Sequence, residues 1–83
     1  MFTVVITPTA QKKFNRLPKN IRTRVLKALE KLRSSPKIGK PLMGEYQGFF
    51  TLRVWPYRVI YKIIRKQLVV EVVDVGHRQG IYQ

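Results

Sequence analysis

The sequence predicts an α+β fold in which a helical hairpin packs on a mainly antiparallel four-stranded sheet, in the order β-α-α-β-β-β. Two observations carry this prediction. Apolar residues recur at helical spacing between residues 8 and 33, and three apolar segments with strand character follow between residues 49 and 75. A chain of 83 residues is long enough for one modest hydrophobic core. We therefore expect a single domain over residues 1–83.

The first strand passes directly into the first helix. Residues 2–6 are rich in β-branched side chains, which favour strands. Thr7 is suited to cap a helix N-terminus, and Pro8 is suited to the first helical position. Apolar residues then lie at helical spacing until Pro18 ends the pattern. The apolar positions of this helix are Ala10, Phe14 and Leu17.

A second and stronger helical pattern ends near Ser34 and Pro36. Its apolar positions are Ile21, Val25, Ala28, Leu29 and Leu32. The residues between them are mostly basic, which predicts a solvated cationic exterior on the helical pair. Residues 37–48 contain several glycines and a proline, so they are expected to form a loop.

Three strands are expected in the second half of the chain. Residues 49–54 and 57–64 alternate in polarity, and the Trp55-Pro56 turn separates them. Residues 68–75 form a nearly continuous apolar run. Such a run is typical of a central strand buried on both faces, and Gly76 is expected to end it.

The net charge is the strongest functional signal, because 17 Lys and Arg residues face only four acids, giving a formal charge of +13. Such a surface attracts nucleic acid, a ribonucleoprotein or an acidic protein. The chain has no cysteine, which excludes disulfides and thiolate zinc sites. No apolar run approaches the ~20 residues of a membrane span. We expect a soluble, cytoplasmic protein with no membrane contact.

The residue types point to chemistry without a metal or another cofactor. Four scattered acids and one histidine offer no ligand cluster, and no glycine-rich phosphate loop is present. Arginine, histidine and tyrosine remain, and they suffice to cleave RNA because the substrate's own 2′-hydroxyl is the nucleophile. The arginine candidates for gripping phosphate are Arg53, Arg58 and Arg78. The candidates for proton transfer are His77 and Tyr82.

Over its whole length the chain resembles the RelE/ParE family of type II toxins from toxin–antitoxin modules. The resemblance is carried by TPTAQKKFNRLP, IRTRVLKALEKL, GKPLMGEYQGFFTLRVWPYRVIY and VVDVGHRQGIY. The most specific combination is G-x-x-x-L-R-V-x-x-Y-R-V-I-Y with the ending V-G-H-R-x-x-x-Y. The resemblance implies a RelE-like fold, similar to that of small microbial ribonucleases.

RelE-like members cut mRNA in the ribosomal A site by the 2′-hydroxyl route, and so inhibit translation. The resemblance therefore implies a metal-independent, ribosome-dependent endoribonuclease, an mRNA interferase. Its implied catalytic residues are Arg58, His77, Arg78 and Tyr82. The two arginines would stabilise the phosphorane, and the tyrosine would stack on the base or assist proton transfer. The residues assigned to substrate binding are Arg53, Tyr57 and Lys62.

The chain departs from the best-studied RelE enzymes at the general base. Those enzymes carry lysines where this chain has Phe49 and Thr51. Either His77 or Glu45 substitutes, or the activity is weak or of another kind. ParE-like members share the fold and inhibit DNA gyrase, so gyrase inhibition and a catalytically inactive homologue stay as alternatives.

The family resemblance also implies the binding partners. An acidic antitoxin would neutralise the basic cleft, and the net charge of the chain suits such a partner. The toxin would act on mRNA and the ribosome. Operator DNA would be bound by the antitoxin in the complex and not by this chain.

Overall fold

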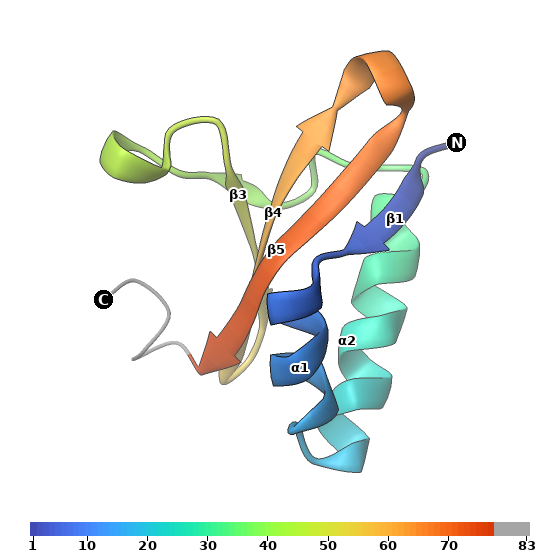
Figure 1. The fold of residues 1–83 in the computed structure, drawn as a ribbon, viewed down its shortest axis with the longest axis vertical. Coiled ribbons are helices and arrows are strands. Elements are labelled where there is room, and N and C mark those ends of the chain that lie inside the picture. The colour runs from blue at the N-terminus through green and yellow to red at the C-terminus, as the bar shows by residue number, and fades with distance from the viewer. Residues whose placement is uncertain (78–83) are drawn as a thin grey trace.

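The computed structural model describes residues 1–77 and has two helices on one face of a five-stranded sheet (Figure 1). The strands are β1 (Thr3–Ile6), β2 (Lys40–Pro41), β3 (Phe50–Val54), β4 (Tyr57–Ile64) and β5 (Val69–His77). The helices are α1 (Pro8–Asn15) and α2 (Lys19–Leu32), and two short 3-10 turns are η1 (Gly44–Tyr46) and η2 (Arg65–Gln67). The strand order is β1-β5-β4-β3-β2, with β1 parallel to β5 and the other pairs antiparallel. The predicted fold class is confirmed.

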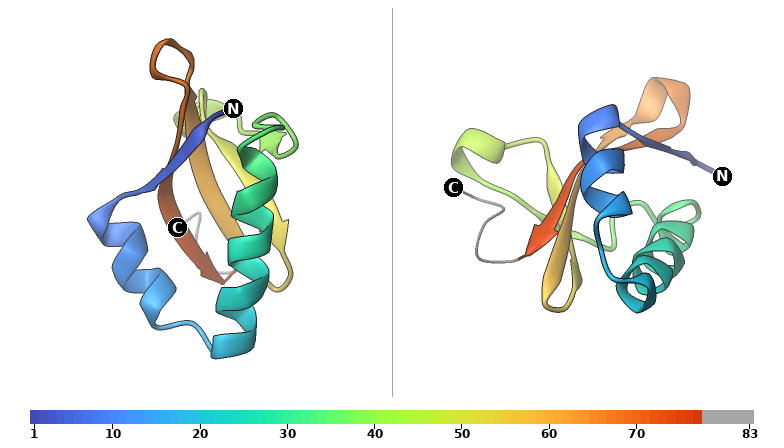
Figure 2. Two further views of the ribbon diagram at one scale, coloured as in Figure 1. Left: turned by 90° about the vertical axis from the view of Figure 1, so that its right-hand side faces the viewer. Right: turned by 60° about the horizontal axis from the view of Figure 1, so that its bottom comes forward.

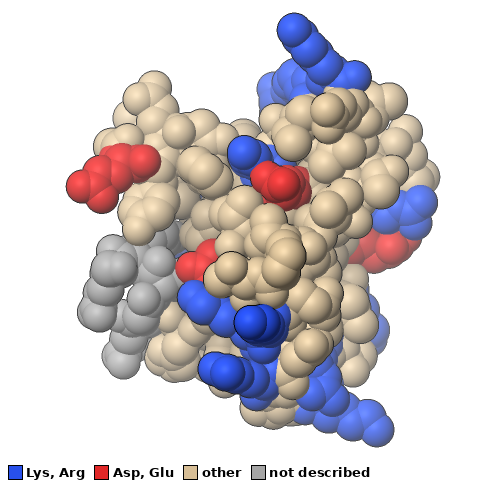
Figure 3. Space-filling model, viewed as in Figure 1, with Lys and Arg blue, Asp and Glu red and all other residues tan. Residues whose placement is uncertain are grey.

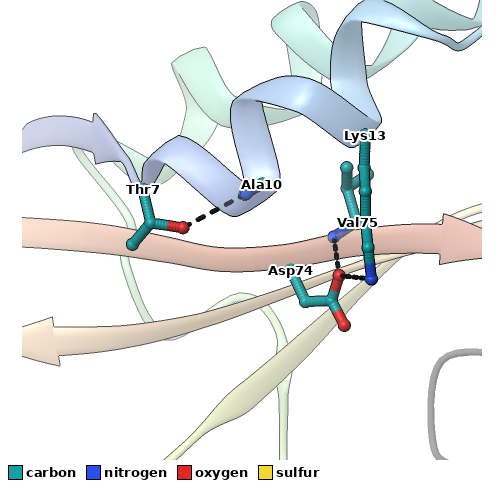
Figure 4. Close-up of polar contacts among 5 residues, drawn as sticks. All are labelled: Thr7, Ala10, Lys13, Asp74 and Val75. Atoms are coloured by element: carbon teal, nitrogen blue, oxygen red, sulfur yellow. Dashed lines mark hydrogen bonds and ion pairs between the residues drawn. The ribbon is translucent and has the colours of Figure 1, made fainter.

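Helix α1 begins at the predicted cap and is tied to β5. The Thr7 side-chain oxygen accepts a hydrogen bond of 3.3 Å from the Ala10 backbone N–H (Figure 4). Further along, Lys13 Nζ donates to Asp74 Oδ1 at 2.8 Å. The same oxygen accepts the Val75 backbone N–H at 2.9 Å. This cluster fixes α1 against the second half of β5, beyond the point where β1 stops pairing with it.

The hydrophobic core lies between the helices and one face of the sheet (Figure 2). Helical spacing places four apolar side chains of α2 on the side that faces the sheet. These are Ile21, Val25, Leu29 and Leu32. The buried residues that meet the helices from β3, β4 and β5 are Val54, Val59, Tyr61, Val70, Val72 and Val75. The core therefore consists of the side chains that the sequence periodicity predicts.

The sheet has one more strand than predicted. Residues 37–48 were expected to be a loop, but Lys40 and Pro41 pair with Thr51 and Phe50 of β3. Two paired residues are too short for any periodic pattern, so β2 leaves no signal in the sequence.

Two expectations for β5 are wrong. The strand does not end at Gly76 but continues to His77, because Gly76 still pairs with Arg58 of β4. It is also buried mainly on one face, since Val70, Val72 and Val75 are buried while the residues between them are partly exposed. In residues 1–77 the helices cover only one side of the sheet (Figure 2). A continuous apolar run usually indicates a strand covered on both faces, but β5 is covered by helices on one face only.

Tyr61 joins the core to the segment that leads into β2. Its buried hydroxyl donates to the Pro36 carbonyl at 2.7 Å and accepts the Gly39 backbone N–H at 3.0 Å. Because Gly39 is followed directly by Lys40, these two bonds fix the position at which β2 begins.

The buried hydroxyl predicts a loss of stability at alkaline pH. Burial raises the pKa of Tyr61 above 10.0, although the hydrogen bond from Gly39 lowers it. Above about pH 10 the unfolded chain therefore holds fewer protons at this residue than the folded chain, and the free energy of unfolding falls as pH rises. Tyr61→Phe should show a smaller decrease between pH 9 and 11 than the wild type, measured by urea unfolding. An equal decrease in both proteins would contradict this assignment.

Candidate functional site

The side of the sheet away from the helices, here called the open face, carries the arginines of β3 and β4. Strand alternation and register place its side chains opposite those of the core. They include Thr51, Arg53, Arg58, Ile60 and Lys62. Figure 2 shows the segment that contains η1 projecting on this side of the sheet, while both helices lie on the other.

Arg53 and Arg58 are direct cross-strand partners on the open face. Facing residues of an antiparallel pair have Cβ atoms roughly 5 Å apart, and like charges in this position repel each other. Neither arginine has an ion pair with an acid of residues 1–77. Across from Arg58 on β5 is Gly76, which has no side chain to occupy the face. A bound anion would relieve the repulsion, and two guanidinium forks are suited to phosphate oxygens.

The arginine pair borders a hollow of about 330 Å³ that also contains a lysine and a buried hydroxyl. The register places Lys40 of β2 opposite Thr51 of β3. Thr51 is buried, and its Oγ1 has no hydrogen-bond partner in the part of the chain that the structure describes. A buried polar group without a partner is costly. The hollow is thus lined by three basic residues, Lys40, Arg53 and Arg58.

Lys40 lines this hollow, although the sequence did not single it out. It is one of many lysines, and it lies in a segment predicted to be a loop. Only the pairing of β2 with β3 shows that it adjoins Thr51, the position where the best-studied RelE enzymes carry a lysine. Strand β2 therefore places Lys40 next to Thr51, which stands where those enzymes have a lysine.

Lys62 shares the open face but is already engaged. Its Nζ lies 3.4 Å from Glu71 Oε1 and 6.0 Å from the centre of the Phe49 ring. It lies four residues along β4 from Arg58, or roughly 13 Å at the usual rise of a strand. Lys62 is thus too far along β4 to share one small ligand with Arg58.

Tyr57 and His77 are together but not with the arginine pair. They are cross-strand partners, and their rings meet edge to face with centroids 5.7 Å apart. Tyr57 packs against the hydrophobic core, so this pair belongs to the helix side of the sheet. His77 lines a hollow there with Lys13 and Arg16 of α1. The residues predicted to form one site are therefore divided between two faces.

The remaining predicted site residues add nothing to the description of either hollow. Arg78 and Tyr82 lie outside the described residues. Glu45 is exposed in η1. Within residues 1–77, no three His, Asp or Glu side chains gather closely enough to hold a metal ion. In the same range, neither helix is long and apolar enough to cross a membrane.

Positive charge is prominent over the helices and at the β4–β5 end of the sheet (Figure 3). Basic side chains gather over the lower parts of the helices and around the turn between β4 and β5, while acidic ones are few and scattered (Figure 3). Three of the four acids are in ion pairs, with Lys13, Arg33 and Lys62. Fold and charge together define a small basic α+β protein whose surface attracts polyanions.

Comparison with known proteins gives the family. Residues 4–82 match the family model described as the ParE toxin of the type II toxin–antitoxin system parDE. Toxin RelG of Mycobacterium tuberculosis is 36% identical over 84 residues, covering 99% of this chain and 97% of the relative. Toxin RelE of the same organism is 30% identical, with 96% and 84% covered. The chain belongs to the RelE/ParE family of type II toxins.

Solved structures agree with this assignment. The RelBE2 toxin–antitoxin complex from M. tuberculosis contains a chain with a TM-score of 0.85 and 35% identity, covering 93% of this chain and 98% of that one. The isolated E. coli RelE toxin has a TM-score of 0.84 and 25% identity, with 99% and 92% covered. The predicted fold and family are both confirmed.

Proposed function

We propose that this toxin inhibits translation by cutting mRNA on the ribosome, without a metal. The observation that carries the proposal is the Arg53–Arg58 pair on the open face, in which Arg53 is exposed, Arg58 is half-buried and neither has an ion pair with an acid of residues 1–77. The two M. tuberculosis relatives that the chain resembles over nearly its whole length are named RelG and RelE, which supports a RelE-like activity.

The chemistry needs few protein groups. The ribose 2′-oxygen attacks the adjacent phosphorus, and the bond from phosphorus to the 5′-oxygen breaks, which leaves a cyclic phosphate and a free 5′-hydroxyl. One proton leaves the 2′-hydroxyl and one reaches the departing 5′-oxygen. Negative charge builds on the phosphorane oxygens between these events. Arg53, Arg58 and Lys40 surround the hollow and would stabilise this charge.

The geometry of residues 1–77 does not identify the groups that transfer the two protons. The sequence suggested His77 as a candidate general base beside the arginines. In the structure His77 lies on the helix side of the sheet, which counts against that role. Tyr82 and Arg78 keep the roles that the family resemblance implies. The ribosome would hold the mRNA in the geometry that in-line attack requires at the arginine pair.

An acidic antitoxin is the proposed protein partner. The structural relatives include the M. tuberculosis RelBE2 complex and the intact E. coli RelBE complex, at 35% and 25% identity. The formal charge of +13 favours rapid association with an acidic chain. Operator DNA would be bound through that antitoxin.

Gyrase inhibition is the second candidate, because the matching family model describes ParE toxins. The two functions are separated by one pair of assays. The protein is added to a cell-free translation reaction with a single defined mRNA, and new 5′ ends are mapped by primer extension. In parallel it is added to a gyrase supercoiling assay. New ends that require ribosomes, with normal supercoiling, are expected; intact mRNA with blocked supercoiling would overturn the proposal.

Lys40 should contribute to cleavage through its charge. Lys40→Ala is expected to lower the cleavage rate on ribosomes about tenfold, because it removes one of three cations around the hollow. Lys40→Arg should retain most of the rate. The matched control is Lys37→Ala, an exposed lysine of the same segment that does not line this hollow. Equal losses in both alanine variants would show an effect of net charge and not of position.

A further inference from the structure

A second basic hollow adjoins the arginine pair at the outer edge of β3. It has a volume of about 440 Å³ and lies between α2 and the end of β3. Its lining residues are Arg24, Lys27, Ala28, Lys31, Arg53, Val54 and Trp55. Strand β2 pairs only with the first two residues of β3, so no strand of residues 1–77 covers this edge at Arg53. The hollow is thus open to solvent and continuous with the open face through one side chain.

The helix cations of this hollow form a row. Arg24, Lys27 and Lys31 are three and four residues apart, which places them on one stripe of α2. All three are exposed, and none has an ion pair within residues 1–77. Like charges at this spacing repel each other, so the row gains stability when an anionic chain lies along it.

An aromatic ring completes the hollow. Trp55 is 50% exposed at the turn between β3 and β4. A half-exposed indole beside a row of cations is the combination that binds single-stranded nucleic acid, since bases stack on the ring while phosphates meet the cations. An acidic protein segment would satisfy the cations but would not need the ring.

We propose that this hollow binds the single-stranded RNA that continues from the phosphate held by Arg53 and Arg58. This inference rests on the proposed function and adds a subsite to it. Arg53 lines both hollows, so a strand that leaves the arginine pair passes over the β3 edge onto Trp55 and the α2 row. The subsite would fix the direction of the strand across the toxin.

The chain contains one tryptophan, so tryptophan emission, excited where tyrosine does not absorb, comes from this hollow alone. The probe is a 2′-O-methyl oligouridine of about nine nucleotides, which lacks the free hydroxyl needed for cleavage. Saturable quenching of Trp55 is expected with the wild type. Lys27→Ala with Lys31→Ala should weaken the affinity about tenfold through the loss of two phosphate contacts. The control pair Lys12→Ala with Lys66→Ala changes the net charge equally at exposed positions outside the hollow and should change the affinity less than twofold.

A third variant identifies the source of the RNA. Arg58 lines the first hollow and not the second. If one strand occupies both, Arg58→Ala weakens the affinity measured at Trp55. An unchanged affinity would mean that the second hollow binds a separate RNA, such as ribosomal RNA, and would overturn the continuous path.

The remaining outcomes separate this inference from the proposed function. No quenching by the oligouridine, with ribosome-dependent cleavage intact, would overturn the subsite alone. Quenching by polyglutamate but not by the oligouridine would instead assign the hollow to an acidic protein. Normal quenching without any cleavage would support the RNA subsite and count against the nuclease.

Discussion

Arg58→Ala is expected to lower the rate of ribosome-dependent mRNA cleavage about 100-fold to 1,000-fold, the usual effect of removing one group that stabilises a transition-state anion. Arg58 is half-buried, faces Arg53 on β3 and pairs on its other side with Gly76, which has no side chain. Arg58→Lys should give an intermediate rate, because it keeps the charge but loses the planar fork that bonds two phosphate oxygens. The measurement is the cleavage rate of one mRNA under single-turnover conditions.

The matched control is Arg65→Ala, at an exposed arginine in η2 that lines neither hollow near the arginine pair. It changes the net charge by the same amount and should leave the rate within about twofold. A normal rate for Arg58→Ala would contradict the site. Equal losses in both variants would show that net charge, and not the arginine pair, sets the rate.

Gly39→Ala is expected to lower the free energy of unfolding by about 2 to 3 kcal/mol. A Cβ at this position would lie 2.5 Å from the Tyr61 hydroxyl and 2.8 Å from the Thr51 carbonyl oxygen. The carbonyl belongs to the backbone of β3 and cannot turn aside. The added methyl group must therefore push the segment off the sheet and strain the hydrogen bonds of Tyr61. Urea unfolding of both proteins measures the effect.

A double variant tests whether Tyr61 is the cause. Tyr61→Phe removes the hydroxyl that lies nearest to the added Cβ. The cost of Gly39→Ala with Tyr61→Phe should therefore be smaller than the sum of the two single costs, by about 1 kcal/mol. Strictly additive costs would mean that the Tyr61 hydroxyl is not the reason why a side chain at position 39 is unfavourable.

The fold was predictable where patterns are long. The apolar spacing of α2 and the Thr7-Pro8 start of α1 gave both helices, and the alternation in residues 49–64 gave β3 and β4. Strand β2 was missed because two residues carry no period. The end of β5 was misplaced because glycine was taken as a stop, although here Gly76 pairs with Arg58 inside the ladder.

The site was predictable in part. Arg53 and Arg58 were both selected from the sequence, and the register places them face to face. Lys40 was missed because its relevance depends on strand pairing, which no local pattern reveals. His77 was grouped with the arginines because it is close to Arg78 in the sequence. Alternation along β5 instead places His77 with Tyr57 on the helix side.

The second hollow could not be found from the sequence at all. The basic residues of α2 were expected to be a solvated exterior, and Trp55 was expected to be part of a turn. Only the packing of α2 against the end of β3 brings Arg24, Lys27 and Lys31 beside the indole. Tertiary structure decides which basic stripe of a helix lies next to an aromatic ring, so the sequence pattern alone does not reveal it.

The central claim is that the substrate's own 2′-hydroxyl attacks a phosphate held by the arginine pair. The most direct measurement uses an mRNA with a single 2′-deoxynucleotide immediately before the mapped cut, compared with the all-ribose mRNA on ribosomes. The account predicts that the wild-type toxin no longer cuts at that position but still cuts at unmodified positions. Unchanged cutting at the 2′-deoxynucleotide would contradict it, because the phosphate would then be attacked by another nucleophile.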